Sequence, residues 1–148
     1  MLHKKIIAFL APASLMTLSL PAVAADPVAK AMEGYLEFTE YGSSLILPQQ
    51  IPAEDWKKIQ IIDARDAEQY TQGHIPGALN MEWRQIVARR QEVRKDGLVV
   101  VYCNTGSLSA QAVFALRLLG WDNVKVLQGG YEEWKAAAGS ATRGQNKL

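Results

Sequence analysis

The sequence has little of several features that would indicate a specialised class of protein. Its 148 residues include one cysteine, which excludes an intrachain disulfide and a multi-cysteine metal cluster. An excess of one charge is also missing, because 16 Lys and Arg residues face 15 Asp and Glu residues. No basic stripe with interleaved aromatic residues is present, which argues against nucleic acid as a partner. With 49% hydrophobic residues the chain is too apolar to be disordered, and its length suits one domain with its own core.

The first 24 residues have the pattern of a secretory signal peptide. A positive segment at 3–5 precedes an apolar run at 6–20, which is shorter than the roughly 20 residues that span a membrane. Pro21 then interrupts the run, and residues 22–24 (AVA) match the small-residue cleavage rule. We expect cleavage after Ala24, export to the periplasm and no stable membrane association of the product. An uncleaved membrane anchor is the alternative.

The remaining sequence predicts short strands that alternate with helices. Apolar runs of strand length lie at 44–47, 59–62, 98–102 and 124–127. Apolar spacing, charged first turns and capping residues predict helices at 27–38, 52–56, 67–72, 83–94, 109–119 and 131–138. The helix at 109–119 has the clearest pattern, with Ala112, Val113, Leu116 and Leu119 on one stripe. Gly120 follows as its C-terminal stop.

The run at 98–101 is continuously apolar, which favours a strand covered on both faces, as in a parallel sheet. Together with the alternation of strands and helices, it predicts an α/β fold with helices on both faces of a parallel sheet. In such sheets, functional residues gather at the carboxyl ends of the strands. Outside this core we expect an N-terminal helical segment at 25–43. We also expect a flexible tail at 139–148, where the residues are small and polar.

Cys103 directly follows the strand predicted at 98–102 and precedes the helix predicted at 109–119. The backbone N–H groups of a loop in this position can converge on the thiol, and the helix N-terminus adds partial positive charge. Both effects lower the pKa of a cysteine and increase its thiolate fraction. Gly106 supplies a residue that can adopt positive φ, which a tight cradle of N–H groups needs. We therefore interpret Cys103 as a nucleophile; the alternative is a small buried apolar side chain at a strand end.

Four short segments carry recognisable patterns: 61–70 (IIDARDAEQY), 73–80 (GHIPGALN), 102–109 (YCNTGSLS) and 120–134 (GWDNVKVLQGGYEEW). In this order they resemble the DxR…EY, GHIPGAxN, active-site-loop and GxxxVxxLxGGxxxW segments of rhodanese-domain sulfurtransferases. The resemblance extends over nearly all of the mature chain. It implies a single rhodanese-like domain at 44–138, with a parallel sheet of about five strands flanked by helices.

The resemblance implies a sulfurtransferase that needs neither a cofactor nor a metal. Thiolate Cys103 attacks a small anionic sulfur donor such as thiosulfate and becomes a persulfide. Cyanide or a thiol, including a protein thiol, then accepts the sulfur. The resemblance makes Cys103 catalytic and assigns the substrate-binding cradle to Asn104, Thr105, Gly106, Ser107, Leu108 and Ser109.

Leu108 departs from the family's pattern, because many thiosulfate-using members have a basic residue there. A positive charge at this position would stabilise a bound dianion and the leaving sulfite. An apolar side chain therefore weakens the case for thiosulfate and leaves the persulfide chemistry intact. Cysteine-dependent phosphatases place an arginine six residues after the nucleophile, where this chain has Ser109, which argues against a phosphatase.

Asp63, Arg65 and His74 are supporting candidates. Asp63 ends a predicted strand, and Arg65 follows two residues later. These two side chains either orient the active-site loop or, in a structural interpretation, pair with a nearby charge such as that of Glu68. His74 has the intrinsic pKa of a general base. Its segment is rich in turn residues, however, which favours a hydrogen-bonding scaffold role.

Two alternatives to an enzyme stay open. The apolar Leu108 favours a non-catalytic rhodanese-like module that binds an anion or a partner peptide. Export to an oxidising compartment favours a redox-active protein in which Cys103 forms a disulfide with another molecule. A persulfide on Cys103 after exposure to a donor is expected only for the sulfurtransferase.

Overall fold

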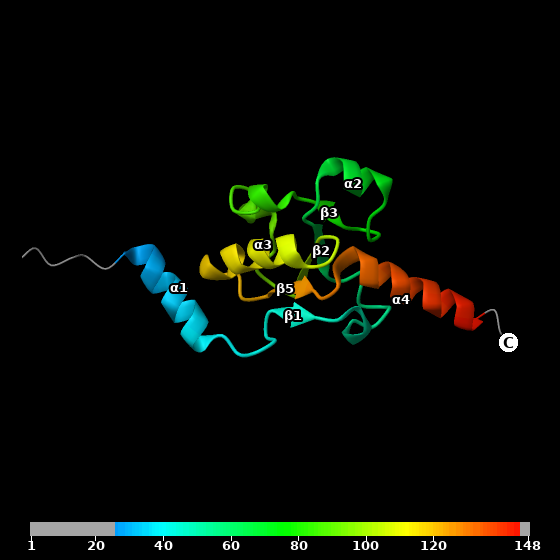
Figure 1. Cartoon of the computed structure of the whole chain (residues 1–148), viewed down its shortest axis with the longest axis horizontal. Helices are drawn as coiled ribbons and strands as arrows, with labels where there is room; N and C mark the ends of the chain where they lie inside the picture. Colours follow the sequence, from blue (N-terminus) through cyan, green and yellow to red (C-terminus); the bar gives the residue numbers. More distant parts are fainter. Residues whose placement is uncertain (1–25, 146–148) are drawn as a thin grey trace, which may run out of the picture.

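The computed structural model describes residues 26–145, so the predicted signal peptide at 1–24 lies outside the described residues. At its centre is a five-stranded sheet in the order β1-β5-β4-β2-β3, with every pair parallel (Figure 1). The strands are β1 (Leu45–Ile46), β2 (Gln60–Asp63), β3 (Leu79–Asn80), β4 (Val99–Tyr102) and β5 (Val124–Leu127). The α-helices are α1 (Pro27–Phe38), α2 (Ala67–Gln72), α3 (Ser107–Leu118) and α4 (Gly130–Gln145). The predicted α/β fold with a parallel sheet is confirmed.

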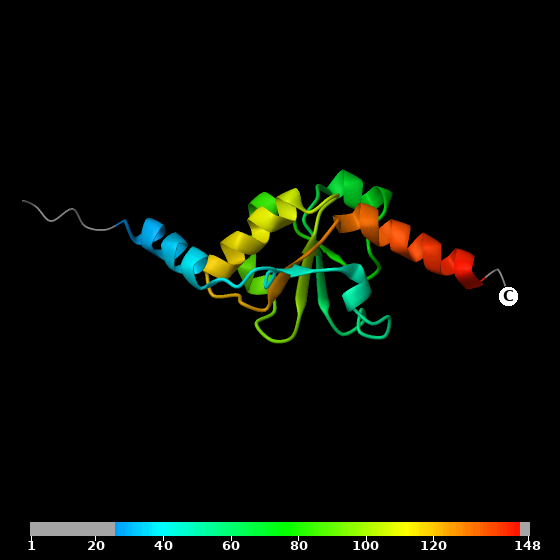
Figure 2. The same ribbon diagram turned by 60° about the horizontal axis from the view of Figure 1, so that its bottom comes forward.

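Both faces of the sheet are buried. In β4, Val99 and Val101 point into one core while Val100 and Tyr102 point into the other, and all four are 0% exposed. Side chains of α3 complete the first core, and side chains at the start of α4 pack against the second. This two-sided burial explains why the apolar run is continuous rather than alternating. Figure 2 shows α1 and α4 extending in opposite directions from the sheet.

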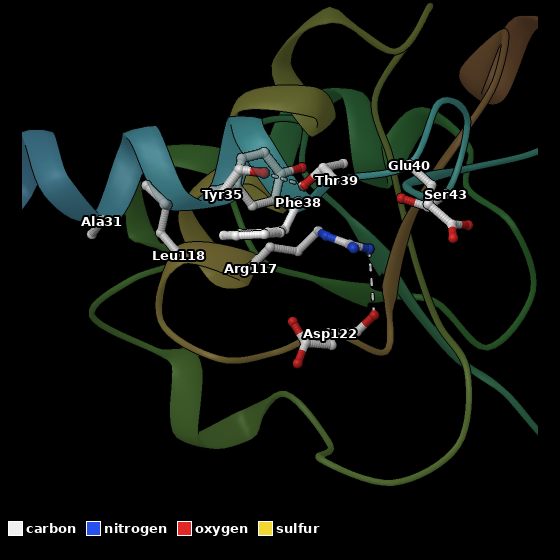
Figure 3. A pocket seen from close by; sticks show the side chains of 9 residues that line it. All are labelled: Ala31, Tyr35, Phe38, Thr39, Glu40, Ser43, Arg117, Leu118 and Asp122. Atoms are coloured by element: carbon white, nitrogen blue, oxygen red, sulfur yellow. Dashed lines mark hydrogen bonds between the residues drawn. The ribbon is translucent and has the colours of Figure 1, made fainter.

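The N-terminal helix α1 packs on α3 and has no buried residue of its own. The Tyr35 ring meets the Phe114 ring edge-on, with 5.1 Å between centroids. Below Tyr35, the guanidinium of Arg117 donates to the carbonyl of Asp122 at 3.4 Å (Figure 3). Tyr35, Arg117 and Asp122 are among the residues that line a hollow of about 480 Å³, and none of the predicted site residues lines it. Within residues 26–145, no helix combines the length and apolar character that crossing a membrane requires.

The helix ends differ in detail from the expectations. α3 begins at Ser107 and ends at Leu118, and the chain turns at Gly120 with φ +83°. Because of this turn Leu119 leaves the expected buried stripe and is 47% exposed. At the other end of the domain, α4 continues to Gln145, whereas the sequence predicts a flexible tail from residue 139.

Three segments correct the sequence analysis. The segment expected to begin a helix at 52–56 instead belongs to consecutive turns, in which Asp55 N–H donates to the Pro52 carbonyl and Lys58 N–H to the Asp55 carbonyl. The helix expected at 83–94 is two short 3₁₀ helices, η2 (Trp83–Gln85) and η3 (Arg90–Glu92). Here the Arg89 guanidinium bridges Glu92 and the carbonyl of Asn80, and this contact ties the segment to the end of β3. β3 was not predicted, because two residues held by pairing with β2 carry no periodic signal.

Candidate active site

Cys103 lies where the central strand β4 ends, and α3 begins four residues later. Gly106 makes the turn into the helix with φ +113°, a conformation that favours glycine. The Cys103 Sγ accepts a hydrogen bond from the Gly106 N–H at 3.2 Å. The Ser109 hydroxyl lies 3.6 Å from the same Sγ and 3.0 Å from the Gly106 carbonyl oxygen. Because a hydroxyl has one proton, Ser109 can donate to the carbonyl or to the sulfur, and the thiolate is the stronger acceptor.

The environment lowers the pKa of Cys103. Burial is the largest single influence and acts in the opposite direction, because it disfavours the charged thiolate. The backbone N–H of Ser109, its hydroxyl, and the N–H groups of Gly106 and Thr105 stabilise the thiolate, and together they outweigh burial. The loop therefore favours the nucleophilic form of the cysteine through dipoles alone.

The six cradle residues predicted after Cys103 lie together in this loop and the first turn of α3, and none carries a charge. Thr105 and Ser107 are exposed, Leu108 is half-buried and Ser109 is buried. Asn104 is half-buried, and its amide group donates to Gln69 of α2 at 2.6 Å. Their roles in substrate binding stay predictions, since their positions alone do not show what they bind.

The start of α4 fixes the Cys103 loop from the other side. The N–H of Tyr131 donates to the Cys103 carbonyl at 2.8 Å, and the N–H of Glu132 to the Asn104 carbonyl at 3.1 Å. Gly130 permits this approach, because a Cβ there would lie less than 3.0 Å from both carbonyl oxygens. Gly130 was missed as a site residue. Its signal was the Gly129-Gly130 pair, which the sequence suggested only as a turn from strand to helix.

Asp63 and Arg65 form a buried ion pair beside the loop. Asp63 is 0% exposed and Arg65 4%, and the guanidinium contacts both carboxylate oxygens. Arg65 also donates to the Gly73 carbonyl at 2.8 Å and reaches Asn104 at 3.4 Å. Burial lowers the pKa of Arg65, but the hydrogen bond and charge of Asp63 reverse this effect and raise it. The two residues therefore pair with each other, which agrees with the structural interpretation except that the partner is not Glu68. Arg65 also contacts Asn104, and an orienting role for the pair stays a prediction.

Tyr102 completes this buried network. Its hydroxyl donates to Asp63 at 2.7 Å and accepts from the N–H of Ile75 at 3.0 Å. Burial, followed by the hydrogen bond to Asp63, raises the pKa of Tyr102, so the phenol stays neutral. The network joins the ends of β2 and β4 to the segment after α2.

His74 lies apart from this network. Its ring stacks on Tyr70 at 3.9 Å between centroids, and its Nδ1 lies 2.9 Å from the Tyr70 carbonyl oxygen. The side chain is exposed and contacts α2 instead of the Cys103 loop. This placement agrees with a scaffold role. In the part of the chain that the structure describes, no group of three His, Cys, Asp or Glu side chains could hold a metal ion.

A hollow of about 470 Å³ lies beside the loop, and we call it the loop-side pocket. Its lining residues are Arg65, Gln69, Gln72, Gly73, Asn104, Tyr131, Glu132 and Lys135. Two cations flank the Tyr131 ring, with the Arg65 guanidinium 4.3 Å and the Lys135 ammonium 4.7 Å from its centroid. Both have carboxylate partners, because Arg65 pairs with Asp63, and Lys135 pairs with Glu132 at 3.0 Å. The pocket therefore presents little uncompensated positive charge.

The fold and the loop together define an α/β protein in which hydrogen-bond donors surround a cysteine sulfur between a buried parallel strand and a helix N-terminus. Residues 49–137 match the family model for the rhodanese-like domain. The chain belongs to the rhodanese-like domain family.

Comparison with individual proteins supports a sulfurtransferase activity in general. A sulfurtransferase from Allochromatium vinosum is 36% identical over 80 residues, which cover 54% of this chain and 75% of that protein. The thiosulfate sulfurtransferase GlpE of Shewanella oneidensis is 32% identical over 93 residues, covering 63% of this chain and 92% of that protein. A rhodanese-related protein from Thermoplasma volcanium, known from its crystal structure, is 25% identical and superposes with a TM-score of 0.58. The match covers 63% of this chain and 91% of that protein's chain. The chain spans less than two thirds of the length of several curated relatives that it matches.

Proposed function

We propose that this chain transfers sulfur as a persulfide on Cys103. The observation that carries the proposal is the cradle around Sγ, in which Gly106 N–H and the Ser109 hydroxyl lie within hydrogen-bond distance of the sulfur. The same donors that stabilise a thiolate also stabilise a persulfide anion. The sulfurtransferase relatives agree with this chemistry.

The reaction has two displacement steps. The Cys103 thiolate attacks the outer sulfur of the donor, a new S–S bond forms, and the donor's own S–S bond breaks with its electron pair leaving on the departing group. With thiosulfate as donor, that group is sulfite. A thiophile such as cyanide or a thiolate then attacks the outer persulfide sulfur, and the Cys103 thiolate is restored. No external oxidant or reductant is needed for either step.

The charge distribution favours a donor with less charge than thiosulfate. No residue from Asn104 to Ser109 is charged, and the two cations that line the loop-side pocket, Arg65 and Lys135, have carboxylate partners. A dianion therefore gains little at this site, whereas the reacting group of a persulfide donor carries one negative charge or none. We propose a low-molecular-weight or protein persulfide as the preferred donor. From the pattern of residues 1–24 we also propose that the protein acts after export.

Intact-mass measurement of the purified protein tests the proposal. Exposure to a persulfide donor should add one sulfur atom, cyanide should remove it, and Cys103→Ser should abolish the gain. A Cys103→Ser variant that gains the same mass would contradict the assignment of the carrier. An unmodified protein that gains no sulfur from any donor would favour the binding module. Covalent dimers that a reductant converts to monomers would favour the redox alternative, although Cys103 is only 2% exposed.

A further inference from the structure

A third hollow, of about 700 Å³, lies next to the loop-side pocket, and we call it the apolar groove. Four isoleucines and two tryptophans are among the residues that line it, including Ile59, Ile75, Trp56 and Trp134. Trp56, Ile59 and Trp134 are only half-buried. An open apolar hollow of this size on a small domain indicates an interaction site.

The apolar groove and the loop-side pocket share two walls. Along the segment 72–77, Gln72 and Gly73 line the pocket, and the next residues, 75–77, line the groove. Along α4, Tyr131 and Lys135 line the pocket and Trp134 lines the groove. The Tyr131 and Trp134 rings stack at 5.8 Å between centroids, so one aromatic pair separates the two hollows. A ligand can therefore extend from one hollow into the other without leaving the surface.

The two hollows differ in chemistry. The loop-side pocket is polar and lies against the Cys103 loop, which suits a thiol or persulfide group. The groove offers apolar surface, to which cyanide, thiosulfate or a small hydrophilic thiol could not bind favourably. An occupant that uses both carries a cysteine and, a few residues away, apolar side chains. A persulfide also places its reactive sulfur about 2 Å beyond Sγ, which eases attack by a thiol on a macromolecule.

We propose that the sulfur acceptor of the Cys103 persulfide is a cysteine-bearing protein segment whose neighbouring apolar side chains lie in the apolar groove. This inference rests on the proposed function and adds the class of partner. The groove adjoins the loop-side pocket, which borders the Cys103 loop at Asn104, and this continuity argues for a sulfur partner over a second copy of the chain, which would need no access to Cys103.

Two synthetic peptides with one cysteine each provide the test. In the first, leucine and isoleucine follow the cysteine; in the second, serines replace them. Transfer from the Cys103 persulfide should have a kcat/KM at least about tenfold higher for the apolar peptide, equivalent to about 1.4 kcal/mol. Ala53→Asp, which places a charge at an exposed position of the groove, should bring the ratio of the two kcat/KM values close to one. Ala88→Asp is the matched control, because Ala88 is also exposed but lines neither hollow, and it should keep the ratio.

Each other outcome overturns the inference in a recognisable way. Equal kcat/KM values for the two peptides in the unmodified protein would show that the groove does not contribute to transfer. A ratio that Ala53→Asp leaves intact would place the apolar contact elsewhere. A dimer in sedimentation experiments that Ala53→Asp dissociates would assign the groove to self-association. Failure of the proposed function is separate, since the unmodified protein would then form no persulfide that cyanide could remove.

Discussion

Removing the Ser109 hydroxyl isolates one donor of the cradle. In Ser109→Ala the thiolate keeps the backbone N–H of Gly106 at 3.2 Å but loses the hydroxyl at 3.6 Å. A hydrogen bond to a charged group contributes about 1.5–3 kcal/mol, and the long distance to sulfur places this one at the lower end. A loss of about 1.5 kcal/mol changes the thiolate-to-thiol ratio by roughly tenfold. The pKa of Cys103 should therefore rise in the variant.

Alkylation by iodoacetamide across a pH series measures this effect, with the ultraviolet absorbance of the thiolate as a second readout. On the acidic side of the titration, Ser109→Ala should react roughly tenfold more slowly, because the rate there follows the thiolate fraction. At alkaline pH, where the thiol is ionised in both proteins, the rates should converge. A change in access to the buried sulfur would instead lower the rate at every pH.

Ser107→Ala is the matched control, because Ser107 lies in the same turn but is exposed, and its hydroxyl does not contact Sγ. Ser107→Ala should leave the pH dependence of the alkylation rate unchanged. The reasoning is refuted if Ser109→Ala keeps the original profile, or if Ser107→Ala moves it equally. Because the Ser109 hydroxyl also lies within hydrogen-bond distance of the Gly106 carbonyl oxygen, the unfolding free energy of the Ser109→Ala variant should be measured as well.

Three further predictions concern the cradle and its supports. Leu108→Arg should raise kcat/KM for thiosulfate by about tenfold, which is the scale of one charge-assisted hydrogen bond. The uncharged Leu108→Gln should not raise it, and equal kcat/KM values for the two variants would show that the missing charge does not limit the reaction. Gly130→Ala should lower the unfolding free energy by more than about 2 kcal/mol in denaturant titrations, because Gly130 has φ +58° and faces two carbonyl oxygens. Gly34→Ala in the open part of α1 should not destabilise, and a similar loss in both variants would contradict the steric argument. The pKa of Cys103 is lower in the folded protein than in the unfolded chain, where it is near 8.5. The Cys103 thiolate therefore contributes fully to folding stability above the unfolded pKa, and this contribution declines as the pH falls through the folded-state pKa. The stability difference between the protein and Cys103→Ser should therefore grow from neutral pH to about pH 9, below the titration of Tyr102, and a constant difference would refute the linkage.

The sequence pattern predicts the parts of the fold in which burial is two-sided or strictly periodic. The apolar run that forms β4 and the stripe of Ala112, Val113 and Leu116 in α3 are of this kind. The position of Cys103 between them follows directly, because a parallel strand and the next helix can be joined only by a short loop at the carboxyl edge of the sheet. The cradle could therefore be anticipated before any contact was known.

Contacts between distant segments could not be anticipated in this way. β3 exists because two residues pair with β2, and the segment at 83–94 breaks into 3₁₀ turns while Arg89 reaches back to Asn80. Gly130 matters because the start of α4 lies within hydrogen-bond distance of the Cys103 loop and leaves no room for a Cβ. Only the three-dimensional structure reveals this need for glycine. The partner of Arg65 is likewise Asp63, because both side chains are buried at the end of β2.

Among residues 26–145, the cations that line the loop-side pocket are paired with carboxylates, and this pairing has a kinetic consequence. A thiolate held by N–H dipoles and a thiosulfate dianion repel each other, and dissolved salt screens that repulsion. The rate of persulfide formation from thiosulfate should therefore rise with sodium chloride concentration in the unmodified protein. In Leu108→Arg the new attraction opposes the repulsion, so the rise should flatten or reverse, whereas a neutral persulfide donor should show no salt dependence in either protein. A rate that falls with salt in the unmodified protein would contradict this account. It would show that Lys135 leaves Glu132 to attract the dianion.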